Sequence, residues 1–330
     1  MWLNEGMVIV ELVSVLLLAL ALVFAARVLM DAFKQLMLMA GWEGRELSYV
    51  LVAVFLMLPE FAVGVAAALE GKGEVFLGNL VGVNLVTVAV VVAGMAMMTG
   101  SVTLTGELSR WEGGMVMLSG VIPMILMFDG ELSRVDGLML VLLYVAYILR
   151  VMALGRHRQF ASGGRMVLTW VKSVVGRDKQ KPFQLMVKMV LSWLVMLVVA
   201  YLLVRQGVKF GEMVGIGSWL VGVLVIGAMV GVVELSLGYL GRGKKHSVLV
   251  FHDVIGGLTA NMTLVLGICV LLFPVEKISV ARMSLAVAMY LFIFGLFWLF
   301  GSIKKRLSRW EGVVLLGCYV MFVGWMLIMR

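Results

Sequence analysis

Apolar runs of about 20 residues, separated by short polar turns, follow one another along nearly the whole chain. Runs of this length suit helices that cross the hydrocarbon core of a bilayer, and their continuity argues against the alternating pattern of a β-barrel. We therefore predict an all-α polytopic membrane protein with about ten transmembrane helices. The expected spans are residues 7–30, 46–70, 75–98, 110–128, 135–152, 185–205, 212–240, 247–273, 281–301 and 310–328.

The composition agrees with this pattern. Of 330 residues, 63% are apolar and only 14% are charged, which excludes an ordinary soluble domain. The first run is too long and too uniformly apolar for a cleaved signal peptide, and is therefore expected to be a span. Both cysteines, Cys269 and Cys318, lie inside apolar runs, so neither a disulfide framework nor a zinc motif is expected. The chain has no P-loop nucleotide motif, and we expect neither an enzyme nor a bound cofactor.

Basic residues fix an expected orientation. With the N-terminus outside, twenty of the 27 Lys and Arg residues fall at the cytoplasmic ends of the spans, many of them in the polar connection 153–184. This bias predicts that both termini are outside and that the connection is cytoplasmic, in a prokaryotic cell membrane. It also explains the net charge of +8 without a nucleic-acid partner, which leaves the lipid bilayer and inorganic cations as the expected partners. The oligomeric state is left open.

The two halves of the chain repeat each other. Glu60 and Glu234 are 174 residues apart, and each is followed after 19 residues by a polar position, Asn79 and Asp253. Further on, LSRVDG at 132–137 matches LSRWEG at 307–312. A repeat of five spans must be inverted in the membrane. We expect a first five-helix repeat at 1–152, a basic linker at 153–184 and a second five-helix repeat at 185–330.

Polar residues are concentrated in two corresponding stretches. Charges within a membrane span are costly, so Glu60, Glu234 and Asp253 require a reason. Pro59 would free a backbone carbonyl, and glycines would let the backbone approach an ion or a neighbouring helix closely. These glycines are Gly78, Gly82, Gly256 and Gly257. The neutral oxygen ligands expected nearby are Asn79, Asn84, Thr87, Thr259 and Asn261.

Two uses remain open for the asparagines. They could coordinate a cation, or they could hydrogen-bond one helix to another within the membrane. Asp253 has a similar ambiguity, because the adjacent His252 could simply pair with it. The carboxylates Glu60 and Glu234 are the strongest candidates for binding a cation, since they occupy matching positions in both halves.

The two stretches resemble the α-repeats of the sodium/calcium exchanger superfamily of cation antiporters. Those repeats read roughly G-T-S-L-P-E and then, on the next helix, G-N-x-x-G-S-N-x-x-[N/D]. LPE at 58–60 and GNLVGVN at 78–84 match the first repeat, whereas VVE at 232–234 and HDVIGGLTAN at 252–261 are a divergent second repeat. The ten-span plan and the inverted halves extend the resemblance over most of the chain.

The resemblance implies that Glu60 and Glu234 bind the transported cation. The hydroxyl pair of the family falls on Leu56 and Met57 in the first half, and its later serine falls on Val83. In the second half these positions hold Val230, Gly231 and Gly257, and the final Asn/Asp positions hold Thr87 and Asn261. The chain therefore lacks the side-chain hydroxyls that the family uses beside its glutamates.

The expected function is secondary antiport of Ca²⁺ or a related cation against Na⁺ or H⁺, by alternating access at a midplane site. The resemblance also implies that the first and sixth spans lie outside the core and slide against it. Two alternatives stand beside this: an inverted-repeat exporter of organic solutes, and a non-transporting relative of the exchanger family.

Overall fold

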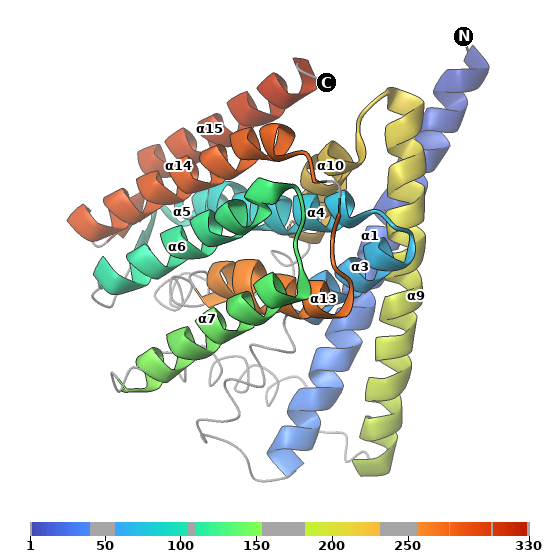
Figure 1. Ribbon diagram of the computed structural model, residues 1–330, viewed down its shortest axis with the longest axis horizontal. Coiled ribbons are helices and arrows are strands. Elements are labelled where there is room, and N and C mark those ends of the chain that lie inside the picture. Colours follow the sequence, from blue (N-terminus) through green and yellow to red (C-terminus); the bar gives the residue numbers. More distant parts are fainter. Residues whose placement is uncertain are drawn as a thin grey trace.

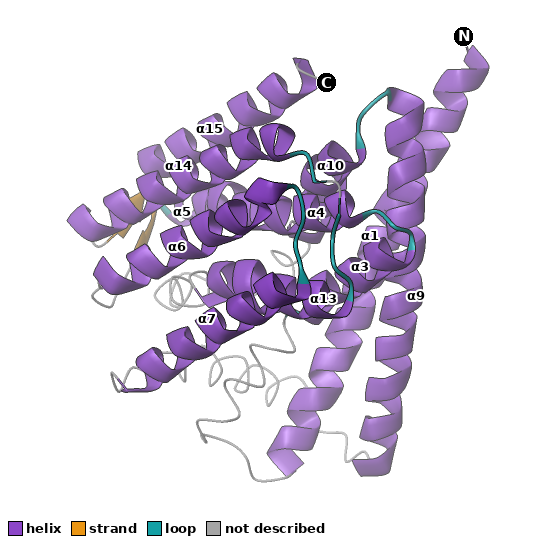
Figure 2. Ribbon diagram, viewed as in Figure 1, coloured by secondary structure: helices purple, strands orange, loops and turns teal. Residues whose placement is uncertain are grey.

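The computed structural model describes residues 2–39, 57–103, 110–153, 182–231, 256–276, 278–304 and 306–328. Nearly all of these residues are helical (Figure 2). The helical stretches are α1 (Trp2–Met39), α3 (Leu58–Leu69), α4 (Gly73–Val86) with η1 (Thr87–Val92) and α5 (Ala93–Thr99), α6 (Arg110–Leu126) with η2 (Met127–Asp129), α7 (Arg134–Ala153), α9 (Pro182–Val214), α10 (Ser218–Leu220) with η3 (Val221–Ile226), η5 (Asn261–Val265) with α13 (Leu266–Leu272), α14 (Val280–Lys304) and α15 (Arg309–Ile328). Two short strands, β1 (Ser101–Thr103) and β2 (Arg306–Ser308), pair antiparallel.

Each of the ten predicted spans corresponds to a helical stretch, so the predicted all-α membrane fold is confirmed. Within the described residues, five helices are long and apolar enough to cross a membrane by themselves: 6–39, 73–99, 182–214, 283–301 and 309–328. Large apolar side chains cover the outside of these helices, including Leu17, Val198 and Met321, which are about 60% exposed or more. Such a surface is stable only when lipid covers it.

The first and sixth spans are longer than predicted. The helices extend beyond the expected ranges 7–30 and 185–205 at both ends. Helix α1 runs for 38 residues, about 57 Å, which exceeds the thickness of the bilayer core. The seventh span begins at Ser218 rather than residue 212, after a turn in which Gly215 has φ of 72°.

Helices α1 and α9 form a pair along one side of the molecule (Figure 1). Glu11 of α1 forms an ion pair with Lys209 of α9, and the hydroxyl of Ser14 donates a hydrogen bond to the Glu11 carbonyl oxygen. The remaining helices run obliquely to this pair (Figure 1). Both termini lie toward the top of this view, and α1 and α9 extend toward the opposite end. The arrangement of α1 and α9 outside the core agrees with the resemblance.

Matching distortions occur in the two halves. The long third span contains a π-helical turn that begins at Thr87, and the eighth contains one that begins at Asn261, 174 residues later. π-helical turns cost backbone hydrogen-bond quality and are frequent at functional sites. The same offset that relates Glu60 to Glu234 therefore also relates two local departures from α-helical geometry.

Matching contacts join the halves to each other. The backbones of Gly137 in α7 and Gly267 in α13 touch, because a Cβ at either glycine would lie 2.8 Å from the carbonyl oxygen of the other. In the second half, Gly312 of α15 approaches the Ala93 carbonyl oxygen in the same way. Gly312 follows Gly137 by 175 residues and Gly267 follows Ala93 by 174. These reciprocal contacts are those expected of inverted repeats.

The S-R-x-[DE]-G sequences at 133–137 and 308–312 form capping boxes at the starts of the fifth and tenth spans. The Ser133 backbone N–H donates to the Asp136 carboxylate at 2.8 Å, and the Asp136 N–H donates to the Ser133 hydroxyl at 3.4 Å. Ser308 and Glu311 repeat the pattern at 2.7 and 3.5 Å. The box satisfies backbone donors that a helix N-terminus leaves unpaired. The hexapeptide thus marks a helix start followed by a closely packed glycine.

Removing a cap should weaken the fold measurably. We expect Ser133→Ala to lower the free energy of unfolding by about 1 kcal/mol, since the helix loses the hydroxyl that accepts its N–H. Ser133→Thr keeps the hydroxyl and serves as the matched control. Thermal melting of purified protein in detergent measures both, and equal melting temperatures for the two variants would show that the cap contributes nothing.

Candidate functional site

Glu60 lies in the first turn of α3. The helix begins at Leu58 with Pro59 at its start, where the absent N–H of proline costs no hydrogen bond. The N-terminal end of a helix carries a partial positive charge, which favours a carboxylate in this turn. The Glu60 side chain is completely buried, at 0% exposure. A fully buried carboxylate in a membrane protein is therefore placed where a helix dipole and any bound cation can both stabilise it.

A tight hairpin brings Asn79 of α4 to about the level of Glu60 on α3. Helix α3 ends at residue 69, the chain turns at Gly71 with φ of 63°, and α4 runs back alongside. A Cβ added at Gly64 would lie 2.8 Å from the Phe76 ring, so these two residues face each other across the hairpin. Because α3 and α4 run antiparallel, Glu60, one turn before Gly64, lies at the level of the residue one turn after Phe76, about residue 80. Asn79 is also completely buried.

Glycines on α4 bring a second helix into backbone contact. A Cβ at Gly82 would overlap the carbonyl oxygen of Val223, and one at Gly78 would overlap that of Trp219. The opposing helix also has a glycine at the contact: a Cβ at Gly222 of η3 would overlap the Val75 carbonyl oxygen. Gly78 and Gly82 therefore have the close-approach role expected of them, against η3. Gly222 was not predicted, because its counterpart in the other half, residue 48, is serine.

Asn84 and Asn261 link the two halves. The Asn261 side-chain amide donates a hydrogen bond of 3.1 Å to the Asn84 carbonyl oxygen Oδ1. The Asn84 amide in turn donates to the backbone carbonyl of Leu258, at 3.4 Å. Leu258 is the residue that corresponds to Asn84 in the second half, 174 positions later. The structure thus shows the helix-linking use of these two asparagines, and Oδ1 of Asn261 remains without a hydrogen bond to any described residue.

Breaking this link should destabilise the protein. We expect Asn84→Ala to lower the free energy of unfolding by about 1–3 kcal/mol, because Asn261 is left buried with an unpaired amide. The double variant Asn84→Ala/Asn261→Ala should lose less than the sum of the two single variants, by about 0.5–3 kcal/mol. Strictly additive melting shifts would contradict a direct interaction between the two side chains.

Two other buried side-chain oxygens of α4 and of the stretch before η5 lack hydrogen-bond partners among the described residues. They are Oδ1 of Asn79 and Oγ1 of Thr259. Helix α3 contacts both α4 and η5, so Glu60 and these groups belong to one region of the interior. Thr87 and Asn261 each begin a π-helical turn there, and Thr87 is partly exposed. The described part of the site offers one carboxylate, several amide oxygens and a hydroxyl, and contains no group of three or more His, Cys, Asp or Glu residues.

Apolar side chains occupy the positions where the family carries hydroxyls. Met57, Val83 and Val230 are 8%, 0% and 1% exposed, so they pack in the interior and offer no oxygen. Among the predicted residues, Glu234 and Asp253 lie outside the described ranges, as does the carbonyl that Pro59 would free. Gly256 is the first described residue of the eighth span and is helical, and a Cβ at Gly257 would meet no described atom within 4 Å. Gly257 therefore marks no close approach to the described residues.

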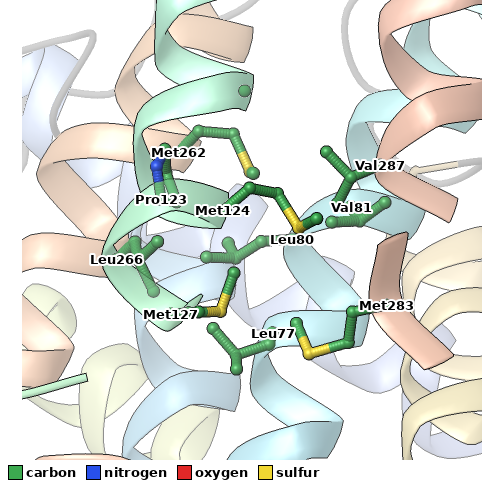
Figure 3. A pocket seen from close by; sticks show the side chains of 11 residues that line it. Leu77, Leu80, Val81, Pro123, Met124, Met127, Met262, Leu266, Met283 and Val287 are labelled. Atoms are coloured by element: carbon green, nitrogen blue, oxygen red, sulfur yellow. The ribbon is translucent and has the colours of Figure 1, made fainter. Parts of the chain in front are cut away.

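A separate cavity lies on another face of α4 (Figure 3). It lies between α4, α6, α14 and the η5–α13 stretch and has room for little more than a water molecule. The residues that line it are Leu77, Leu80, Val81, Gly120, Pro123, Met124, Met127, Met262, Leu266, Met283 and Val287. None of their side chains carries an oxygen, so this cavity lacks the hard ligands that Na⁺ and Ca²⁺ prefer.

The chain matches the model of a known protein family over both of its halves. The family model described as sodium/calcium exchanger protein matches residues 10–153 and again residues 185–328. The chain belongs to the sodium/calcium exchanger family. Relatives of this chain are named as a sodium/calcium exchanger and as an antiporter, which supports cation antiport as the general function of this integral membrane protein.

Individual relatives agree along most of the chain. The Escherichia coli (strain K12) inner membrane protein YrbG is 24% identical over 326 residues, covering 98% of this chain and 97% of that protein. The sodium/calcium exchanger MaX1 of Methanosarcina acetivorans is 24% identical and covers 83% of this chain and 86% of its own length. The crystal structure of the H⁺/Ca²⁺ exchanger CAX superposes with a TM-score of 0.70 at 19% identity, covering 97% of this chain and 86% of that one. The last comparison shows a shared fold.

Proposed function

We propose that this sodium/calcium exchanger family member moves Ca²⁺ or a related cation in exchange for Na⁺ or H⁺, with Glu60 and Glu234 as the residues that bind the cation. The observation that carries the proposal is the Glu60 carboxylate, which is fully buried at the start of α3 where α3, α4 and η5 meet. A buried carboxylate is expensive in a membrane interior, and a bound cation would neutralise its charge.

The inverted halves support alternating access. The two glutamates come from matching positions in oppositely oriented repeats, so small rearrangements could present one site to either side of the membrane. Asn79, Asn84, Thr87, Asp253 and Asn261 would supply further oxygens, although Asn84 and Asn261 must reorganise their shared hydrogen bond to do so. The α1–α9 pair, which lies outside the core, would slide to open and close access.

The choice of exchanged ions follows from the number of oxygens available. Ca²⁺ takes 6–8 oxygen ligands, and two glutamates supply up to four of them. Met57, Val83 and Val230 stand at positions where the family carries hydroxyls, so those oxygens are absent as ligands for Na⁺. A proton needs only a carboxylate oxygen. The named relatives include one Na⁺/Ca²⁺ exchanger and one H⁺/Ca²⁺ exchanger, and the experiment below therefore drives transport with each ion separately.

The membrane orientation is also part of the proposal. The distribution of Lys and Arg supports outside N- and C-termini and a cytoplasmic 153–184 linker between repeats 1–152 and 185–330, in a prokaryotic cell membrane. Ten predicted spans would place both termini on one side of the membrane, and Figure 1 shows both ends of the chain toward the same end of the molecule.

Flux through purified protein in liposomes tests the function. Vesicles containing Na⁺, or buffered to give an outward H⁺ gradient, are diluted into radioactive Ca²⁺, and uptake is compared with that of protein-free vesicles. We expect saturable Ca²⁺ uptake that one of the two gradients drives and that dissipating this gradient abolishes. Absence of uptake with both gradients, together with no saturable binding of Ca²⁺, Na⁺, Mn²⁺ or Mg²⁺ in titration calorimetry, would instead identify a non-transporting relative.

A further inference from the structure

We infer that Phe61 and Trp193 form the contact through which cation occupancy at Glu60 controls the position of α9. The inference rests on the proposed function, since it requires that Glu60 bind a cation. Phe61 follows Glu60 directly in the first turn of α3. Its ring stacks on that of Trp193 in α9, with centroids 6.2 Å apart and an interplanar angle of 18°. This places an α9 side chain one residue away from the proposed cation ligand.

The local geometry makes this contact rigid at its α3 end. The Phe61 N–H donates a hydrogen bond of 3.1 Å to the Met57 carbonyl oxygen, so Phe61 and Glu60 belong to the same hydrogen-bonded turn. A backbone shift that lets the Glu60 carboxylate close around a cation therefore displaces the Phe61 ring as well. Helix α9 packs against α3, and Figure 1 shows the two side by side.

A second contact joins the same two helices at the other end of α3. The Tyr201 hydroxyl of α9 lies next to the Glu70 carboxylate at the end of α3, and Arg205 lies beside it. From Phe61 to Glu70 is nine residues, and from Trp193 to Tyr201 is eight, so the helices run in parallel along this interface. The apolar stack lies at the cation end of α3, whereas the polar contact lies at the end where α3 turns into α4. Only the stack is adjacent to a cation ligand.

The pseudo-symmetric positions do not repeat this stack. The residue of α1 that corresponds to Trp193, 174 positions earlier, is Ala19, which is 2% exposed and packed in the core. The residue after Glu234 is Leu235 rather than an aromatic residue. The aromatic stack beside Glu60 therefore has no equivalent at the matching pair of positions, Leu235 and Ala19. Phe61 and Trp193 act as positioning residues, because neither carries an oxygen for the cation.

The expected effect follows from the strength of an aromatic pair. Such pairs contribute about 0.5–1.5 kcal/mol, which corresponds to about 2- to 12-fold in an equilibrium or a rate. A ligand can shift a conformational equilibrium only by its differential affinity, and the coupling is reciprocal. Loss of the stack should therefore change apparent Ca²⁺ affinity and maximal exchange rate together, each within this 2- to 12-fold range.

The experiment combines Ca²⁺ flux with tryptophan fluorescence in the full-length protein. Wild type should show a Ca²⁺-dependent change in emission that Trp193→Phe removes and that Trp310→Phe, at an 80% exposed position on α15, retains. In liposomes, Trp193→Ala should slow exchange about 2- to 12-fold, Trp193→Phe should restore most of the rate, and Trp310→Ala should match wild type. Phe61→Leu added to Trp193→Ala should cause little further loss.

The outcomes separate the inference from the proposed function. If wild type shows no Ca²⁺ exchange, or if Glu60→Gln exchanges as wild type does, then the proposed function fails and the inference fails with it. If Glu60→Gln abolishes exchange but Trp193→Ala exchanges at the wild-type rate, only the inference is overturned. The same holds if the emission change survives in Trp193→Phe, or if the losses from Phe61→Leu and Trp193→Ala are additive. Misfolding of Trp193→Ala would leave the Trp193→Phe fluorescence result to decide.

Discussion

Glu60→Gln is expected to abolish cation exchange. Glutamine keeps the size of the side chain and one oxygen ligand, but it removes the negative charge that compensates a cation in the buried site. Removing one partner from a buried charge pair costs about 3–5 kcal/mol, which corresponds to roughly 100-fold or more in affinity. Radioactive Ca²⁺ uptake into liposomes, measured over a range of Ca²⁺ concentrations, gives both the maximal rate and the apparent affinity.

A second buried carboxylate provides the control for this substitution. Glu311 is 6% exposed and caps α15 by accepting a hydrogen bond from the Ser308 N–H. Glu311→Gln keeps the size of the side chain and its capping geometry, since glutamine also serves in capping boxes. Exchange by Glu311→Gln should therefore match wild type. Ca²⁺ exchange that survives Glu60→Gln would remove Glu60 from the site, whatever the Glu311 variant does.

Gly82→Ala is expected to destabilise the protein more than the other substitutions outside the site. The added methyl group would overlap the Val223 carbonyl oxygen, a backbone atom that cannot rotate away. The α4–η3 crossing must then open, at a cost of about 1–3 kcal/mol. Because the crossing involves helices from both halves, exchange should fall together with stability. Thermal unfolding followed by size-exclusion chromatography in detergent measures the loss.

Gly94→Ala is the matched control for Gly82→Ala. Gly94 lies further along the same span, in α5, and a Cβ there would meet nothing within 4 Å. Alanine is the better helix former by about 1 kcal/mol, so Gly94→Ala should melt at or above the wild-type temperature. A lower melting temperature for Gly94→Ala than for Gly82→Ala would show that backbone crowding is not what requires glycine at position 82.

The ten-span fold was predictable because the bilayer imposes a length and a polarity on every helix that crosses it. The ends of α1 and α9 were not predictable by the same rule. Beyond the hydrocarbon core a helix can continue with charged residues, and Lys209 is accommodated in α9 by its pairing with Glu11 of α1. That interaction joins residues 198 positions apart, so no local pattern in the sequence announces it.

The candidate site divides in the same way. Glu60 could be selected from the sequence, because a carboxylate in an apolar run is costly and because its spacing to Asn79 recurs in the second half. The role of Asn84 could not be predicted from the sequence. An asparagine is equally suited to coordinating an ion and to bridging helices, and only the position of Asn261 across the interface shows which contact it makes.

The sequence by itself therefore determined the membrane-spanning class, the two related halves and the positions of the costly carboxylates. Each of these depends on composition, on periodic spacing or on comparison of the chain with itself. Only the tertiary structure decided that Gly78 and Gly82 face η3, that Asn84 hydrogen-bonds Asn261, and that Trp193 lies on Phe61. Those contacts join helices far apart in the chain, and the rotation of each helix about its axis is set by packing against its neighbours.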